Sequence, residues 1–360
     1  MNNLCSNPAD LFDLNKNKSG AFAPQLFIIH HSLLTIQGFT LRKEYKMDNL
    51  IVSYAPHIRS ARSTKKLMAD VVIALIPALI AGIVFFGLPA LVHTLVCVAS
   101  CMFFEFIWEK IFKLPITVFD FSAIITGMLL AFNLPVSAPY WIGVVGSAFA
   151  IIIVKMFFGG LGNNFVNPAL AGRAFLLACW PVIMTKWTSP KFNLSLTTDA
   201  VSTATPLGAL KESGEVIASY SDLFFGNIGG CIGEVSAFAI LIGLAYLLVR
   251  KVITWRVPVI YIGVVFVLTE LLGQDGLYFI LSGGLMLGAV FMATDYVTSP
   301  MSGTGLIIYA IGLGVLTVVI RIFGKLPEGV TYSILIMNIV TPLIDRYFKN
   351  RIYGGIKNEK

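Results

Sequence analysis

The sequence predicts an all-α polytopic membrane protein with about ten transmembrane helices in two inverted five-helix repeats. Hydrophobic residues make up 57% of the 360 residues and charged residues only 12%. Several apolar runs reach the roughly 20 residues that cross a bilayer. Because a soluble fold carries far more charge on its surface, this composition excludes a large soluble domain.

The apolar runs and their Pro, Gly and charge interruptions define each span in order. Lys110 and Lys113 separate the second span from the third, and Arg250, Lys251 and Arg256 separate the sixth from the seventh. The first half contains spans at residues 67–87, 90–109, 117–134, 139–158 and 168–186. The second half contains spans at residues 234–250, 256–273, 277–294, 304–323 and 331–347.

The basic residues predict the orientation of these spans. The net charge is +7, yet no aromatic-basic cluster accompanies it, so we expect no nucleic-acid partner. Lys and Arg instead flank the spans on one side, which the positive-inside rule assigns to the cytoplasm. Both termini are therefore expected to be cytoplasmic. Arg321 and Lys325 are exceptions on the opposite side.

The same pattern divides the chain into segments. Residues 47–66 and 348–360 are predicted to be cytoplasmic, and residues 67–186 and 234–347 to form the two membrane halves. Residues 187–233 form an extracytoplasmic loop in this scheme. Residues 1–46 contain one apolar run, which His30 and His31 interrupt, and they show no clear signal-peptide pattern. We expect this extension to be disordered, or absent if translation begins at Met47.

Five cysteines show no spacing typical of a metal site. Cys97 and Cys101 lie one helical turn apart, while Cys5, Cys179 and Cys231 are distant in sequence. No Cys-x-x-Cys pair occurs, so we expect small buried thiols in helices and no metal site. A cluster shared with another subunit stays open as an alternative.

A short internal similarity supports the repeat. The third span contains Gly-Met-Leu-Leu-Ala-Phe-Asn at residues 127–133, and the eighth contains Gly-Leu-Met-Leu-Gly-Ala at residues 284–289. Because each half has five spans, the halves have opposite orientation, as in many transporters. Two Gly-rich apolar helices can also look this similar by chance.

Two polar segments interrupt the apolar sequence, at residues 159–168 and 292–300. Backbone freed from helical bonding near the bilayer needs protein or water partners, so such breaks usually line a cavity. Asn side chains there can both donate to and accept from the edge of a flavin or similar ring. The alternative is that Asn-Pro and Ser-Pro serve only as turns and caps.

The extracytoplasmic loop contains the hydroxyl-rich sequence Ser-Thr-Ala-Thr-Pro at residues 202–206. The hydroxyl of Thr205 can form a phosphoester, and Pro206 disfavours helical geometry at the residue before it. We therefore expect Thr205 to be extended and accessible. The alternative is a cap on a helix that begins near Leu207.

These segments together resemble the D subunit of the Rnf electron-transport complex and the related B subunit of the sodium-pumping NADH:quinone oxidoreductase. The resemblance rests on Asp199 and residues 202–205, on residues 159–175 and on residues 292–300, and it covers about residues 50–350. The four-residue motif is weak alone but specific when the other two segments accompany it.

The resemblance implies two cofactors. In this family the threonine that ends the motif carries FMN through its phosphate, attached by a flavin transferase, which corresponds to Thr205. Ser202 and Asp199 would help the transferase to recognise the loop. A non-covalent riboflavin would lie near Asn164 and Asn167. The redox chemistry then belongs to the flavin, so no catalytic side chain is expected.

The resemblance also implies partners. These are the other Rnf subunits, expected to be RnfA, RnfB, RnfC, RnfE and RnfG (the A, B, C, E and G components), together with the lipid bilayer and, indirectly, ferredoxin and NAD. The complex would couple electron flow between ferredoxin and NAD to export of sodium ions or protons.

Ionisable residues in or near the spans are candidates for an ion path, because charge is costly there. They are Asp70, Glu105, Asp120, Glu270 and Asp295. Asp70 can pair with Lys66, and Glu109 lies beside Lys110, whereas no basic residue lies one turn from Glu105 or Asp120 on its own helix. Glu105 and Asp120 are thus the stronger candidates, with Asp295 a third. Arg173 is predicted to be a counter-ion or a contact for the flavin phosphate.

Three functions are compatible with the sequence. The first is the flavin-bearing subunit of an Rnf complex, and the second is the corresponding quinone-reductase subunit. The third is a flavin-free solute channel or transporter with the same inverted repeat.

Overall fold

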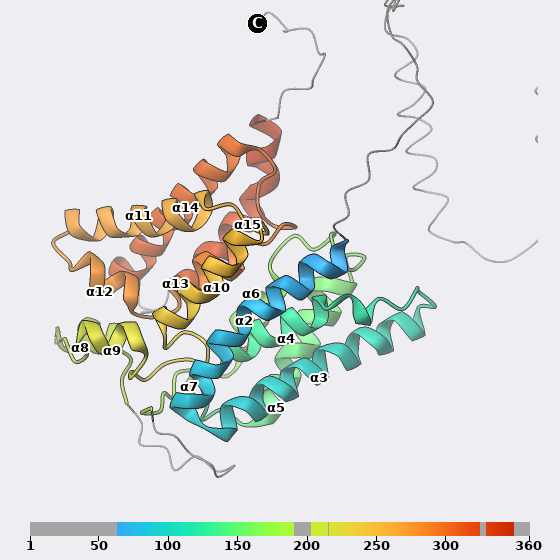
Figure 1. Ribbon diagram of the computed structural model, residues 1–360, viewed down its shortest axis with the longest axis horizontal. Helices are drawn as coiled ribbons and strands as arrows, with labels where there is room; N and C mark the ends of the chain where they lie inside the picture. Colours follow the sequence, from blue (N-terminus) through green and yellow to red (C-terminus); the bar gives the residue numbers. More distant parts are fainter. Residues whose placement is uncertain (1–62, 191–202, 215, 325–328, 349–360) are drawn as a thin grey trace, which may run out of the picture. The chain divides into compact units, whose positions relative to one another are not determined.

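The computed structural model describes residues 63–190, 203–214, 216–324 and 329–348. All of them belong to one unit, which runs from Ser60 to Lys360. Within these ranges the regular structure is entirely helical (Figure 1). The prediction of an all-α fold is confirmed for this part of the chain.

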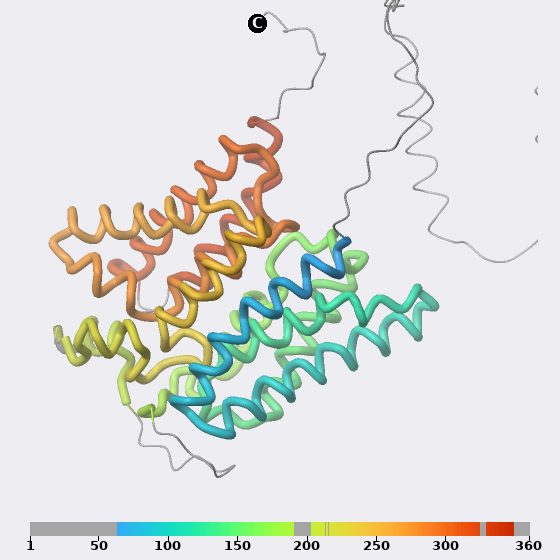
Figure 2. Tube along the Cα trace, viewed as in Figure 1, coloured from blue at the N-terminus to red at the C-terminus, as the bar shows by residue number. Residues whose placement is uncertain are grey.

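The first group of helices follows the order of the predicted spans and is drawn from blue to green in Figure 2. Its members are α2 (Thr64–Phe86), α3 (Leu88–Ile111), η2 (Val118–Asp120), α4 (Ser122–Phe132), α5 (Tyr140–Ala148), η3 (Phe149–Met156), α6 (Pro168–Cys179) and α7 (Pro181–Met184). The element η3 is a π-helix that continues α5 without a break.

Two short helices follow in the predicted extracytoplasmic loop, α8 (Pro206–Ser213) and α9 (Tyr220–Phe225). The second group then comprises α10 (Ala237–Val249), α11 (Arg256–Leu271), α12 (Gly276–Leu281), α13 (Leu285–Leu287), η4 (Gly288–Met292), α14 (Gly303–Phe323) and α15 (Val330–Tyr347). The element η4 is again a π-helix.

Three of these helices are long and apolar enough to cross a membrane by themselves, namely α2, α3 and α14. Many of their large apolar side chains are exposed, including Ile80, Val84 and Leu95. Exposed apolar surface on this scale is typical of helices that face lipid. The chain is therefore consistent with a multi-pass membrane protein.

Three predicted spans are interrupted or shortened. The third begins only at Ser122, because Phe121 adopts a left-handed conformation with φ 71° after the turn η2. The fifth ends at Cys179, and Pro181 starts the separate helix α7. The eighth is broken between α12 and α13, where Gly283 has φ +67°. Such a positive φ favours glycine because it has no Cβ.

The two groups pack through corresponding helices. The first helix of each group, α2 and α10, are neighbours, and so are α6 and α15, which correspond to the fifth and tenth predicted spans (Figure 1). The short helices α4 and η4 end beside each other, since the side-chain nitrogen of Asn133 lies 3.8 Å from the sulfur of Met292. One apolar core joins residues from both groups.

A turn that follows the isolated bridge between Pro135 and Cys231 connects the two groups at the end of α4. The N–H of Ile232 donates to the carbonyl of Leu134 at 3.2 Å, and that of Gly233 donates to Phe132 at 3.0 Å. A Cβ on Gly233 would overlap the side chain of Phe132, so the close approach requires glycine. The loop before α10 is thus held against the end of α4.

Candidate functional site

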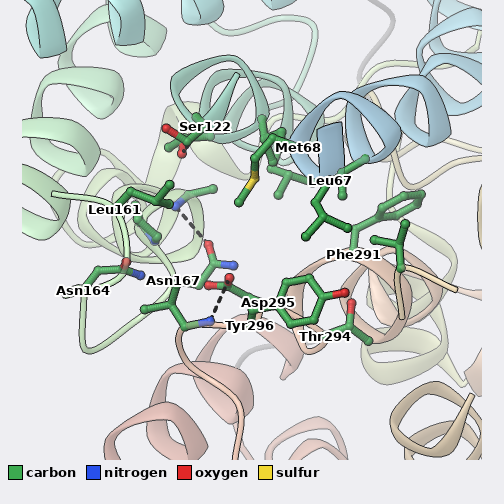
Figure 3. A pocket seen from close by; sticks show the side chains of 18 of the residues that line it. Leu67, Met68, Ser122, Leu161, Asn164, Asn167, Phe291, Thr294, Asp295 and Tyr296 are labelled. Carbon is green, nitrogen blue, oxygen red and sulfur yellow. Dashed lines mark hydrogen bonds between the residues drawn. The ribbon is translucent and has the colours of Figure 1, made fainter. Parts of the chain in front are cut away.

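The structure contains an open cavity with a volume of about 100 Å³. Its walls come from α2, α4, η3, α6, η4 and the segments that follow α10 and η4. Most of the lining is apolar, and its polar or charged residues include Ser122, Lys155, Asn164, Asn167 and Asp295 (Figure 3 labels all except Lys155).

Asn164 and Asn167, the two residues predicted near a flavin, both line this cavity. The Asn167 oxygen caps α6 by accepting from the N–H groups of Ala169 at 3.1 Å and Leu170 at 3.3 Å. Its amide nitrogen makes no hydrogen bond among the described residues. Asn164 donates to the carbonyl of Val166 at 3.0 Å, which leaves its oxygen as an acceptor. The cavity thus offers an amide donor and an amide acceptor to a ligand.

Asp295 reaches the same cavity from the second group of helices (Figure 3). Its carboxylate accepts from the N–H of Val297 at 3.3 Å and from the hydroxyl of Thr298 at 3.2 Å. These bonds are the turn chemistry considered as the alternative for this segment. The segment therefore both forms a turn and lines a cavity. It lines this cavity together with Asn164 and Asn167, which are distant from it in sequence.

A buried chain of charged and polar groups extends behind the cavity. The Lys155 ammonium donates to Glu105 at 2.7 Å and to the hydroxyl of Ser122 at 2.7 Å. The Ser122 hydroxyl donates to Asp120 at 2.5 Å. Glu105 and Asp120, both predicted ion-path residues, are thereby connected through Lys155 and Ser122. Their prediction relied on the absence of a basic residue one turn away on the same helix, which holds for Glu105, but Glu105 has a basic partner, Lys155, on η3.

Three other acidic residues in or near the spans have structural partners, namely Asp70, Glu109 and Glu270. Asp70 pairs with Arg250, the C-cap residue of α10, at 3.1 Å rather than with Lys66. Glu109 accepts from the N–H of Thr117 at 3.0 Å rather than pairing with Lys110. Glu270 accepts from the N–H of Gly276 at 3.0 Å. Each of these bonds fixes one helix or loop against another.

Arg173 does not line the large cavity. Its guanidinium donates to the side-chain oxygen of Asn133 at 2.6 Å and to the sulfur of Cys231 at 3.6 Å. The residue is buried and links α6, the end of α4 and the loop before α10. This placement supports a role in joining the two groups of helices.

Thr205 is the N-cap of α8. Its backbone is extended, with φ −68° and ψ 154°, as Pro206 predicts. Its hydroxyl oxygen accepts from the N–H of Gly208 at 3.0 Å, which is the cap considered as the alternative. The expectation of an accessible side chain was wrong, because the residue is only 8% exposed.

A small cavity of about 10 Å³ adjoins Thr205. Three glycines contribute to its wall, Gly229, Gly230 and Gly283, so little side-chain volume fills it. Glu234 also lines it, and one carboxylate oxygen of this buried residue has no partner among the described residues. Asp199 and Ser202, the predicted recognition residues, lie outside the described part of the chain.

Sequence reasoning missed Lys155 and Glu234. Both are ionisable and lie within or at the start of predicted spans, so the cost of burying charge was a signal that could have found them. A basic residue inside a span is as costly as an acidic one, and Lys155 is the partner that offsets the cost of burying Glu105.

The cysteines show no metal-ligand arrangement among the described residues, where no group of three metal-ligating side chains occurs. Cys97, Cys101 and Cys231 are buried, as predicted. Cys179 is exposed, so the prediction of burial was wrong there. Cys5 lies outside the described residues.

Comparisons with known proteins place these features in a family. Residues 51–354 match the family described as the NQR2, RnfD, RnfE family. The chain is 55% identical over 317 residues to the D subunit of the Na(+)-translocating ferredoxin:NAD(+) oxidoreductase complex of Acetobacterium woodii, covering 87% of this chain and 98% of the relative. It is 43% identical over 327 residues to the D subunit of the Proton-translocating ferredoxin:NAD(+) oxidoreductase complex of Clostridium ljungdahlii, covering 86% and 98%. The D subunit of the Ion-translocating oxidoreductase complex of Stutzerimonas stutzeri is 38% identical over 327 residues, covering 81% and 92%.

Proposed function

The chain belongs to the NQR2, RnfD, RnfE family, and from this membership we propose that it is the D subunit of an Rnf-type ion-translocating ferredoxin:NAD oxidoreductase. The observation that carries the proposal is the 55% identity over 98% of a relative with that name. The protein would act in a bacterial inner membrane with the A, B, C, E and G components of the complex, and with ferredoxin and NAD as the indirect electron partners.

We further propose ten spans in two inverted halves, with both termini in the cytoplasm. The pairing of α2 with α10 and of α6 with α15 supports this, because equivalent helices of two repeats meet at their shared interface. The adjacent ends of α4 and η4 also support it. Discontinuous helices that meet near the midplane are typical of inverted-repeat membrane proteins.

Thr205 is our proposed attachment point for FMN, through a phosphoester made by a flavin transferase. One observation supports the fit. The hydroxyl lies at the N-terminus of α8, where backbone N–H groups and the helix dipole favour negative charge such as a phosphate. The carboxylate of Glu234 would repel a phosphate, so we place the phosphate toward α8.

The large cavity is our proposed site for a non-covalent riboflavin. The free amide donor of Asn167 and the amide acceptor of Asn164 suit the polar edge of a flavin ring, and the apolar walls suit its faces. When bound, a flavin supplies one-electron and two-electron redox chemistry. The protein's own residues orient the ring and exclude water from it.

The ion path remains a proposal. Glu105, Asp120 and Asp295 are our candidates, because all three lie in or behind the cavity wall. The relatives from Acetobacterium woodii and Clostridium ljungdahlii are named for different ions, sodium and protons. We therefore propose export of one of these two ions without choosing between them.

Flavin fluorescence in a denaturing gel tests the central proposal. Protein co-expressed with a flavin transferase should fluoresce after denaturation, and Thr205→Ala should abolish the signal completely. Thr203→Ala is the matched control, since it removes a hydroxyl two residues away and should keep the signal. No fluorescence in the wild-type protein would contradict both flavin-bearing functions and support the flavin-free transporter.

The electron acceptor used by membrane vesicles distinguishes the two flavin-bearing functions. Membrane vesicles that reduce NAD with ferredoxin indicate an Rnf complex, whereas quinone reduction with NADH indicates the quinone reductase. Sodium uptake that persists with a protonophore would identify sodium as the coupling ion. Loss of sodium uptake in the presence of the protonophore would identify protons.

A further inference from the structure

We propose that Lys155 sets the reduction potential of the flavin in the large cavity, acting as the positive charge nearest to the ring. This role rests on the proposed function, because it takes the cavity to hold a flavin. It belongs to a residue for which sequence reasoning had assigned no role.

Burial makes the position of Lys155 unusual. Its side chain is 3% exposed, and the residue lines the cavity. Lysine side chains are rarely buried unless they are paired or functional, because the ammonium loses its hydration. Among the described residues that line this cavity it is the single cation.

The hydrogen bonds leave capacity for a ligand. An ammonium has three donors. Two of them go to Glu105 and Ser122, and the third makes no hydrogen bond among the described residues. A ligand in the cavity can therefore accept a hydrogen bond from this third N–H, or interact with the positive charge through space.

The local backbone gives a second, independent indication. Lys155 lies on the π-helix η3, and the opposite group contributes the π-helix η4, whose Val290 and Phe291 also line the cavity. π-helical turns are rare and frequently occur at functional sites. Two of them at one cavity mark it as more than a packing defect.

The proposed effect follows from charge. An electron that reaches the ring from reduced ferredoxin through the complex adds one negative charge, and no bond forms or breaks in that step. A nearby ammonium stabilises this charge, whereas the carboxylate of Glu105 opposes it. Lys155 should therefore raise the potential and Glu105 should lower it.

The test uses the full complex with Thr205→Ala, so that the cavity flavin is measured without the covalent one. Spectroelectrochemical titration gives its midpoint potential. Lys155→Gln should lower the equilibrium constant for one-electron reduction at least tenfold, a shift of about 59 mV toward negative potential. Glu105→Gln should shift the potential in the opposite direction, and Lys155→Arg should restore it toward that of the parent.

A purely structural ion pair predicts a different pattern. If Lys155 only holds η3 against α3, Lys155→Gln and Glu105→Gln should have the same effect on flavin retention and neither should shift the potential. The double variant Lys155→Gln with Glu105→Gln keeps the net charge unchanged and avoids an unpaired buried ion. Lys110→Gln, which removes an exposed lysine of α3 outside the cavity, should leave the potential unchanged.

The outcomes separate the proposed flavin site in the large cavity from the proposed role of Lys155. Unchanged potentials with normal flavin content would overturn the role of Lys155 alone. Absence of acid-extractable flavin from the parent complex would overturn both the cavity assignment and the role of Lys155. Shifts of opposite sign in the two single variants would support both.

Discussion

Asp275 shows at the scale of one residue how the extracytoplasmic loop is fastened. Its carboxylate caps α12 by accepting from the N–H of Tyr278 at 3.0 Å, and it also accepts from the hydroxyl of Tyr220 in α9. Both bonds favour the ionised carboxylate, with the tyrosine bond the larger contribution, so the pKa of Asp275 lies below its ordinary value of 3.8. This residue joins the loop helix α9 to the second membrane group.

We expect Asp275→Ala to destabilise the protein by about 0.5–1 kcal/mol at neutral pH, the low end for a lost helix cap. A lowered folded pKa means that the stabilisation is complete above the unfolded pKa and is lost as pH falls through the folded pKa. The difference between wild type and variant should thus shrink below pH ~4. Thermal unfolding in detergent across pH measures it, with Glu212→Ala as a neutral control.

Single residues also show where sequence reasoning reached its limit. The extended backbone of Thr205 followed from Pro206, because that restriction is local. The burial of Thr205 and the bond from Lys155 to Glu105 depend on tertiary packing, and the latter joins residues 50 positions apart. Hydrophobic pattern identifies the helices on which such groups lie but not which of their faces meet.

Close helix packing dominates at the scale of the elements. Gly243 lies in α10 where it meets α2, and a Cβ there would collide with the backbone oxygen of Ala74 and come within 2.7 Å of Phe291. Small residues let membrane helices approach in this way. Gly263 in α11 offers a contrast, because nothing lies within 4 Å of its added Cβ.

We predict opposite results for these two glycines. Gly243→Ala should destabilise by about 1–3 kcal/mol, the usual cost of overpacking. Gly263→Ala should stabilise by roughly 0.5–1 kcal/mol through helix propensity. The melting temperatures of the two variants and of the wild type in the same detergent measure both effects. A Gly243→Ala protein as stable as the wild type would contradict the packing of α10 on α2.

Helix existence was more predictable than helix continuity. Most predicted spans begin and end within a few residues of an observed helical segment, because apolar length is a strong signal. The breaks at Trp180 and Ser282 were missed, since a short interruption hardly changes the average hydrophobicity of the run. The sequence Ser-Gly-Gly at residues 282–284 was nevertheless a local signal for a break.

At the scale of the whole molecule, the proposed topology puts the two candidate sites on opposite sides. The large cavity is lined by the start of α2 and the end of α10, which are predicted to be cytoplasmic. Thr205 lies in the predicted extracytoplasmic loop. Electrons passing between the two sites would therefore cross much of the membrane thickness.

Cysteine labelling tests this arrangement. Lys65 in α2 and Glu212 in α8 are both exposed, so each accepts a cysteine without disturbing a core. In a Cys179→Ser background, which removes the exposed native thiol, Glu212→Cys should react with a membrane-impermeant maleimide added outside, whereas Lys65→Cys should react only after the membrane is permeabilised. The reverse pattern would contradict the proposed orientation.

The hydrogen bond that caps α8 at Thr205 would make flavin attachment depend on whether modification or folding of α8 comes first. The same oxygen that would bond to the phosphate already accepts a hydrogen bond in the closed fold, and the residue is nearly buried. A transferase would therefore compete with folding of α8 for a brief window after the loop reaches the far side of the membrane. If α8 folds before modification, the transferase could not reach Thr205 until the first turn of the helix opens again. The yield of loaded protein would then depend on the relative rates of export, modification and closure.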